Sequence, residues 1–170
     1  MKRRLGFLAF AAMVLPPAAL HAAPWHLFKL NGPAGLFFFD AHSVVRKGDT
    51  VTIWIRQAMD TARPDAGRTA VIAAHDVFDC KARSIRTLRA DMYARDGTLL
   101  DSDRRDKPDF FPEADTPGAH FVDIACLPDF PALTHPDLYS AVPAGDLNAY
   151  AAQYFADHPK VQAEPASKSP

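Results

Sequence analysis

The sequence has little cysteine and none of the short motifs that mark the common enzyme classes. Its 170 residues include only two cysteines, Cys80 and Cys126. It contains no Gly-rich nucleotide loop, no Gly-x-Ser-x-Gly nucleophile elbow, no His-Glu-x-x-His pair and no Cys-x-x-Cys motif. These absences argue against a nucleotide-dependent enzyme, an α/β-hydrolase, a zinc protease and a zinc ribbon.

The sequence has no apolar stretch long enough to cross a membrane. Its longest apolar stretch has the features of an export signal. The stretch from Leu5 to Leu15 has 11 residues and ends at Pro16, which is too short to span a bilayer. It follows the basic start MKRR and precedes LHAAP, where cleavage after Ala22 or Ala23 is expected. Residues 1–22 are therefore predicted to be a signal peptide of a periplasmic or secreted protein. Because the apolar stretch is this short, we expect no membrane span, and because no cysteine stands at the cleavage site, we expect no lipid anchor.

The chain has no excess of basic residues. Removing Lys2, Arg3 and Arg4 with the signal peptide takes Lys+Arg from 19 to 16 against 20 acidic residues, so the formal charge moves from -1 to -4. Nucleic-acid-binding domains normally carry a basic excess on one face. The composition therefore predicts no nucleic-acid partner.

The two cysteines are expected to pair. In an oxidising compartment, two lone thiols in a domain of this size are more often bonded to each other than free. They are 46 positions apart, and closing such a span stabilises a fold by about 4 kcal/mol in the loop-closure model. The alternative is a reactive Cys80 thiol beside Lys81 and Arg83, but the second cysteine makes pairing the simpler interpretation.

Alternating patterns predict several strands. Val51, Ile53 and Ile55 share one face of a strand from Thr50 to Arg56, with Trp54 on the other face. The Ala-, Leu- and Arg-rich region 69–95 favours a helix by composition, but Asp96-Gly97 is typical of a hairpin turn. We therefore predict strands in this region and an N-terminal hairpin, over the ranges Trp25 to Leu30, Gly35 to Phe39, Thr69 to Phe78, Ser84 to Ala94 and Thr98 to Asp103.

Two helices are predicted further along the chain. Gly118 to Leu127 has one apolar side and carries Cys126 near its end, so the disulfide would join this helix to the strand before Cys80. Asp146 is a candidate N-cap for a C-terminal helix, whose apolar side recurs at helical spacing and consists of Leu147, Tyr150, Ala151, Tyr154 and Phe155. Residues 159–170 have few large apolar groups and are predicted to be disordered.

A family resemblance rests on a series of spaced segments. These are FFFDAHSVVRKGDTVTIWI, VFDCKARSIRTL, MYARDGTLL and TPGAHFVDIAC, preceded by Trp25. In their order and spacing the chain resembles the bacterial surface-adhesin protein E-like family. The resemblance implies an α+β domain over residues 24–128, in which an antiparallel sheet of about five or six strands has a helix tethered to one face by the disulfide.

Three features of this chain differ from the family pattern. It lacks the cysteine that lipidates some relatives, and Phe110-Phe111 stands where relatives often carry a tryptophan. The 44 residues after Cys126 have no counterpart in the pattern, so residues 129–158 are expected to be an extension containing the C-terminal helix.

Three groups of polar residues are candidate sites. Lys81, Arg83, Arg86 and Arg89 form a basic strip that suits an acidic glycan or protein partner, or else is a solvated face balanced by nearby aspartates. His75 beside Asp76, and His120 with Asp123 and Cys126, are the alternatives for a hydrolase or a zinc site. No nucleophile accompanies His75, and an oxidised Cys126 cannot bind metal, so we expect no catalytic residue, metal or cofactor.

The function predicted from these features is a non-enzymatic binding or envelope-associated module. Its partner would be an extracellular or envelope protein or a glycan. The alternative is a small periplasmic enzyme or metal-binding protein that uses His75 or His120. Phe37, Phe38 and Phe39 cannot all face one side of a strand, so at least one packs under the C-terminal helix or forms a homodimer contact.

Overall fold

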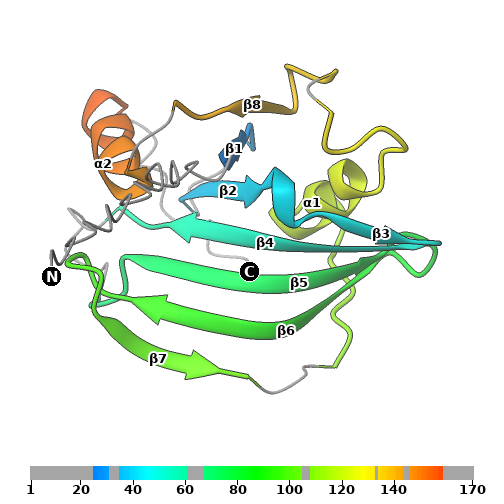
Figure 1. Cartoon of the computed structure of the whole chain (residues 1–170), viewed down its shortest axis with the longest axis horizontal. Helices are drawn as coiled ribbons and strands as arrows, with labels where there is room; N and C mark the ends of the chain where they lie inside the picture. Colours follow the sequence, from blue (N-terminus) through cyan, green and yellow to red (C-terminus); the bar gives the residue numbers. More distant parts are fainter. Residues whose placement is uncertain are drawn as a thin grey trace, which may run out of the picture.

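The chain folds into one antiparallel sheet with a helix on each face (Figure 1). The computed structural model describes residues 25–30, 35–60, 67–104, 108–132, 134–143 and 146–158. The strands follow the order β7-β6-β5-β4-β2-β1-β8, with β3 also paired to β4. Their bounds are β1 Trp25–Phe28, β2 Leu36–Asp40, β3 Val45–Lys47, β4 Thr50–Ala58, β5 Val71–Asp79, β6 Ser84–Tyr93, β7 Leu99–Asp103 and β8 Tyr139–Ala141.

The α+β class and the antiparallel sheet are confirmed, but the sheet has eight strands in its described part rather than five or six. The three-residue strands β3 and β8 account for the difference. Strands of this length carry too few residues to show an alternating pattern. The helical alternative for region 69–95 is wrong, because β5 and β6 occupy it and pair along their whole length.

A short 3-10 turn, η1 (Ala41–Ser43), separates β2 from β3 on the same side of β4. Asp40 caps this turn, and its carboxylate accepts a hydrogen bond from the His42 amide at 2.9 Å. The Ser43 hydroxyl accepts the backbone N–H of Trp54 at 2.9 Å. A side chain thus satisfies the Trp54 amide at the point where the ladder is interrupted.

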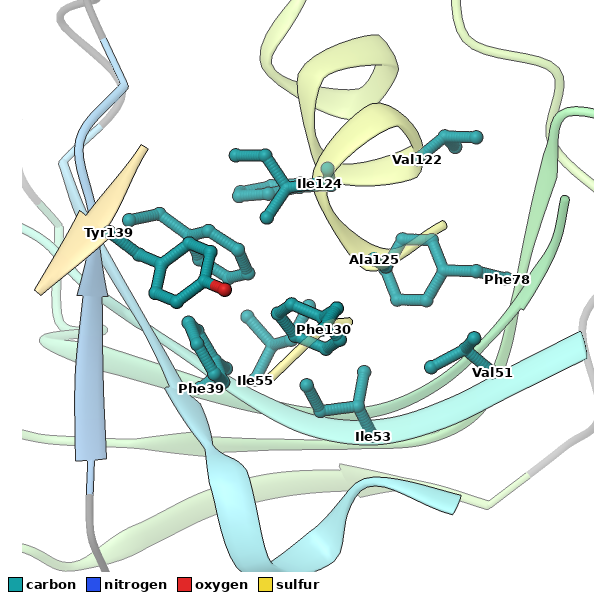
Figure 2. Packing of buried hydrophobic residues seen from close by; sticks show 12 residues of the cluster. Phe39, Val51, Ile53, Ile55, Phe78, Val122, Ile124, Ala125, Phe130 and Tyr139 are labelled. Carbon is teal, nitrogen blue, oxygen red and sulfur yellow. The ribbon is translucent and has the colours of Figure 1, made fainter. Parts of the chain in front are cut away.

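The first face of the sheet packs against helix α1 (Pro117–Ala125) (Figure 2). Neighbouring residues of β2 point to opposite faces, so Phe37 and Phe39 lie on this side and Phe38 on the other. The buried cluster here combines the sheet, α1 and the segment after it: Phe28, Phe39, Val51, Ile53, Ile55, Phe78, Phe121, Val122, Ile124, Ala125, Phe130 and Tyr139.

The C-terminal end of α1 is fixed by three interactions. Cys126 is its C-cap and is bonded to Cys80, which follows β5. The Arg46 guanidinium from β3 donates to the carbonyls of Ala125 and Leu127 at 2.9 and 2.8 Å. These carbonyls have no partner within a helix, so a cation there is favourable. The predicted disulfide and its tethering of a helix to the sheet are confirmed.

The second face packs against helix α2 (Leu147–Asp157). Asp146 caps this helix, and its carboxylate accepts the Asn148 amide at 2.8 Å. Leu147, Ala151 and Phe155 are buried against residues of β1, β2 and β4, which include Leu27, Leu36, Phe38 and Ala58. Phe38 therefore packs under the C-terminal helix, which was one of the two alternatives for the triple phenylalanine.

The predicted signal peptide (1–22) and the predicted disordered tail (159–170) lie outside the described residues. Within the described part of the chain, neither helix has the length and apolar character that a bilayer crossing requires.

Replacing both cysteines with serine should lower the free energy of unfolding by about 4 kcal/mol, because the open chain regains the entropy of a 46-residue loop. Urea unfolding of the two forms measures the difference. Arg83→Gln is the matched control, since it removes an exposed ion pair with Asp123 at the same end of α1 and should cost less than about 1 kcal/mol. An unchanged urea midpoint in the double serine variant would contradict the expectation.

Phe155→Ala should destabilise the fold by roughly 3 to 5 kcal/mol, because it empties the centre of the contact between α2 and the sheet. The exposed Gln153 of the same helix provides the control, and Gln153→Ala should change stability by no more than about 0.5 kcal/mol. Thermal unfolding of the three proteins checks this, and equal melting temperatures would mean that α2 contributes nothing to the fold.

Candidate binding surface

The face that carries α2 also carries a set of half-buried and exposed aromatic and cationic side chains. Ala58 lies under α2, and Trp54 and Arg56 occupy the same face because they are an even number of residues away on β4. Across the strands Trp54 pairs with His75 of β5, which in turn pairs with Arg89 of β6. We call Trp25, Trp54, Arg56, His75, Arg86 and Arg89 the open-face cluster.

The rings in this cluster stack closely. The indole of Trp54 and the imidazole of His75 are parallel within 8°, with centroids 4.7 Å apart. The guanidinium of Arg89 lies 5.8 Å from the Trp54 ring centroid, and that of Arg56 lies 5.4 Å from the Trp25 ring centroid. Contacts of this kind are favourable by about 0.5 to 1 kcal/mol at exposed sites and by more when desolvated. The cluster is therefore a preformed surface.

Arg89 is held in place by a neighbouring carboxylate of its own strand. Its Nη2 atom lies 2.7 Å from the carboxylate of Asp91, whose side chain is only 4% exposed. The Ser102 hydroxyl from β7 donates to the same carboxylate at 2.6 Å. The hydrogen bond from Ser102 and then that from Arg89 hold the pKa of Asp91 below its usual range. Asp91 thus remains ionised at neutral pH and fixes the guanidinium against Trp54.

His75 is neutral at physiological pH. Its partial burial against Trp54 lowers the pKa of the imidazole. The surface around it therefore gains its positive charge from the arginines alone at neutral pH.

The structure divides the predicted basic strip into two pairs. Arg86 and Arg89 lie on the open face, since they pair with Val77 and His75 of β5, and Arg86 Nε is 3.8 Å from Asp109. Lys81 and Arg83 instead lie in the turn between β5 and β6, where Arg83 forms a 2.6 Å ion pair with Asp123 of α1.

Sequence reasoning missed the aromatic half of the surface. Trp54 was assigned to the face opposite Val51, Ile53 and Ile55, which is correct. The rest of the surface depends on how the strands pair. This pairing brings His75 and Arg89 beside Trp54, and it cannot be read from one strand alone.

The histidines of the alternative function are placed differently from what a catalytic site needs. Asp76 follows His75 on β5 and points to the other face, where it accepts a 2.6 Å hydrogen bond from Thr87. The Asp79 carboxylate accepts the amides of Lys81 and Ala82. Neither carboxylate therefore orients His75.

His120 is exposed on α1, and Cys126 is in the disulfide. Among the residues that the structure describes, no three His, Cys, Asp or Glu side chains gather in an arrangement able to hold a metal ion.

Asp76 is a buried carboxyl beside the α1 core. This residue is 8% exposed. Its cross-strand partner on β4 is Ile53, which is fully buried. Burial raises the pKa of Asp76 from 3.8 to about 6, although the hydrogen bond from Thr87 opposes this rise. The folded protein therefore binds the Asp76 proton more tightly than the unfolded chain does.

Asp76→Asn should stabilise the protein above pH 6 and have little effect below pH 4. Because the folded pKa is raised, the wild-type protein loses stability as pH increases from about 4 to about 6, by about 3 kcal/mol for a shift of this size. The asparagine cannot ionise, and its amide oxygen still accepts from Thr87.

Urea unfolding of both proteins at pH 4 and pH 8 measures this effect. The comparison isolates Asp76, because His26 and His75, whose pKa values are lowered by burial, are common to both. An equal difference in stability at the two pH values would show that folding does not raise the pKa of Asp76.

Comparison with known proteins identifies the family. The family model described as "Surface-adhesin protein E" matches residues 25–127, which is more than half of the chain. The chain therefore belongs to the surface-adhesin protein E family, and the resemblance found in the sequence is confirmed. No curated protein matches it.

Several solved structures of protein E from Haemophilus influenzae match this chain. One has 15% sequence identity and a TM-score of 0.42, and the match covers 66% of this chain and 90% of that one. Protein E from a non-typeable strain has 14% identity and a TM-score of 0.41, with 85% and 95% covered. A selenomethionine form has 16% identity and a TM-score of 0.40, with 53% and 78% covered.

Proposed function

We propose that this chain is an exported, non-enzymatic binding module of the bacterial envelope or its surroundings. Two observations support the proposal. The chain belongs to a surface-adhesin family, and its sequence begins with a predicted signal peptide at residues 1–22. The module would act in the periplasm or after secretion, and its partner would be an extracellular or envelope protein or a glycan.

The contact surface in this proposal is the open-face cluster. The observation that carries it is the stack of Trp54 on His75 with the Arg89 guanidinium beside the indole. Tryptophan and arginine are the residues most enriched at binding hot spots, because they combine a large apolar area with polar groups. Trp54, His75 and Arg89 are half-buried, the two rings are stacked, and Arg89 is fixed by Asp91, so binding would cost little side-chain entropy.

The arginines give the surface a preference for acidic partners. Arg86 is exposed at the end of the cluster, and Lys81 lies in the turn beyond it. Arg56, Arg86 and Arg89 form the charged part of the proposed surface, and Lys81 and Arg83 would extend it to the turn between β5 and β6. Charge complementarity of this kind acts mainly on association rate and partner choice.

Binding of the mature chain to a panel of purified matrix proteins and acidic polysaccharides tests the proposal. We expect at least one member to bind, and Trp54→Ala and Arg86→Gln each to weaken that binding by about tenfold or more, equivalent to about 1.4 kcal/mol. Arg68→Gln is the charge-matched control, because Arg68 is exposed ahead of β5 and outside the cluster. Circular dichroism verifies that each variant is folded.

The turn residues are tested separately by a Lys81→Gln/Arg83→Gln double variant. A weakened interaction in this variant would extend the surface to the turn, and an unchanged one would confine it to the face. Full binding by a folded Trp54→Ala/Arg86→Gln double variant would overturn the assignment of the surface. Conversion of a panel member to a product would overturn the non-enzymatic function.

A further inference from the structure

A small pocket lies where α2 meets the ends of β4 and β5. It has a volume of about 290 Å³. Its apolar wall includes the buried residues Ala58 and Val71 from the sheet and Ala151 and Phe155 from α2. Alanines face the space from both sides, and their short side chains leave a volume that larger residues would fill.

Backbone hydrogen bonds hold the sheet side of this pocket together. The Met59 amide donates to the Ala70 carbonyl at 2.9 Å, and the Ala70 amide donates to the Tyr93 carbonyl at 2.8 Å. Both Met59 and Ala70 line the pocket. These bonds tie the residue after β4 to the residue before β5 and to the end of β6. The pocket is therefore preformed, as small-molecule sites usually are.

Five of the eleven residues that line the pocket come from the C-terminal extension. The family match ends at residue 127, whereas α2 supplies Asn148, Ala151, Ala152, Phe155 and Ala156 to the lining. The pocket shares no residue with the open-face cluster. Any ligand it binds is therefore independent of the proposed adhesive function, and either proposal can fail without the other.

The polar groups of the pocket carry charges of both signs. Asp60, which follows β4, and Arg95, in the turn between β6 and β7, both line the pocket and bear charges of opposite sign. Asn148 adds an amide that both donates and accepts hydrogen bonds. Asp60 and Arg95 also interact with other groups of the chain. A ligand would therefore bind to side chains that already have partners within the protein.

The size of the pocket restricts the class of ligand. Ligand pockets commonly have volumes of about 300 to 1,000 Å³, so this one is at the small end of the range. It suits a single small molecule and is too small for a long lipid chain or a polymer. The complementary molecule has one positive group, one negative group and an apolar body.

We propose that this pocket binds a free apolar α-amino acid. The ligand carboxylate binds at Arg95, its ammonium group binds at Asp60, and its side chain occupies the apolar wall formed by Ala58, Ala151 and Phe155. Asn148 hydrogen-bonds the polar end of the ligand. The C-terminal extension thereby adds a small-molecule site to the family domain.

Titration calorimetry on the mature full-length chain with L-leucine, L-methionine and L-phenylalanine tests the site. We expect saturable binding of at least one of them. N-acetyl-phenylalanine lacks the positive charge and phenylalaninamide lacks the negative charge, so each should bind about tenfold or more weakly than phenylalanine. Glycine, which has no apolar body, should not bind measurably.

A matched pair of variants locates the binding. Ala152 and Ala149 are both exposed residues of α2, but only Ala152 lines the pocket. Ala152→Trp should fill the space and reduce affinity by about tenfold or more, whereas Ala149→Trp should bind as the wild type does. Because both changes are at exposed positions, both variants should fold.

Three outcomes would overturn the proposal. The first is the absence of binding by all three amino acids at millimolar concentration. The second is equal binding of phenylalanine and its two singly charged analogues, which would mean that the two charges are not recognised. The third is unchanged binding by the folded Ala152→Trp variant, which would place the ligand elsewhere.

Discussion

The register between β4 and β5 is the constraint on which the rest of the structure depends. These strands pair residue by residue from Thr50↔Asp79 to Ala58↔Val71 without a shift. The same register sets Ile53 beside Asp76 on the α1 side and Trp54 beside His75 on the other. A slip of β4 by one residue would exchange its two faces, turning Trp54 into the core and exposing Ile53 and Ile55. Burial of Val51, Ile53 and Ile55 against α1 therefore also fixes the surface on the opposite side.

The two helices cover different parts of the sheet. On the α1 side the buried residues of β4 are Val51, Ile53 and Ile55, whereas on the α2 side the buried residue is Ala58, at the other end of the strand. Strand β4 is therefore apolar along most of its α1 face but only at one end of its α2 face. The other positions on the α2 face are left for polar groups. Trp54 occupies such a position, which explains why a large aromatic ring remains half-exposed in the middle of a sheet.

The sequence was most informative where one residue or one pattern decided the structure. Strict alternation located β4, the two cysteines identified the disulfide, and Asp96-Gly97 predicted the hairpin, where Gly97 indeed adopts a positive φ of 82°. Composition was misleading for β5 and β6, because their helix-favouring alanines and arginines are overruled by pairing across the sheet. The open-face cluster was only partly predicted, since Trp54, His75 and Arg89 are brought together by register, which is a property of three strands at once.

The segment after the matched family domain is part of the same fold. Strand β8 pairs with β1 and covers its outer edge, and an uncovered edge would invite pairing with other chains. Helix α2 covers Leu27, Leu36 and Phe38, all of which belong to the matched region. Without these elements, residues 25–127 would expose an apolar patch and an open strand edge together. The extension is therefore required by the surface that it covers, and the pocket beneath α2 is a consequence of covering that surface with alanines rather than with larger side chains.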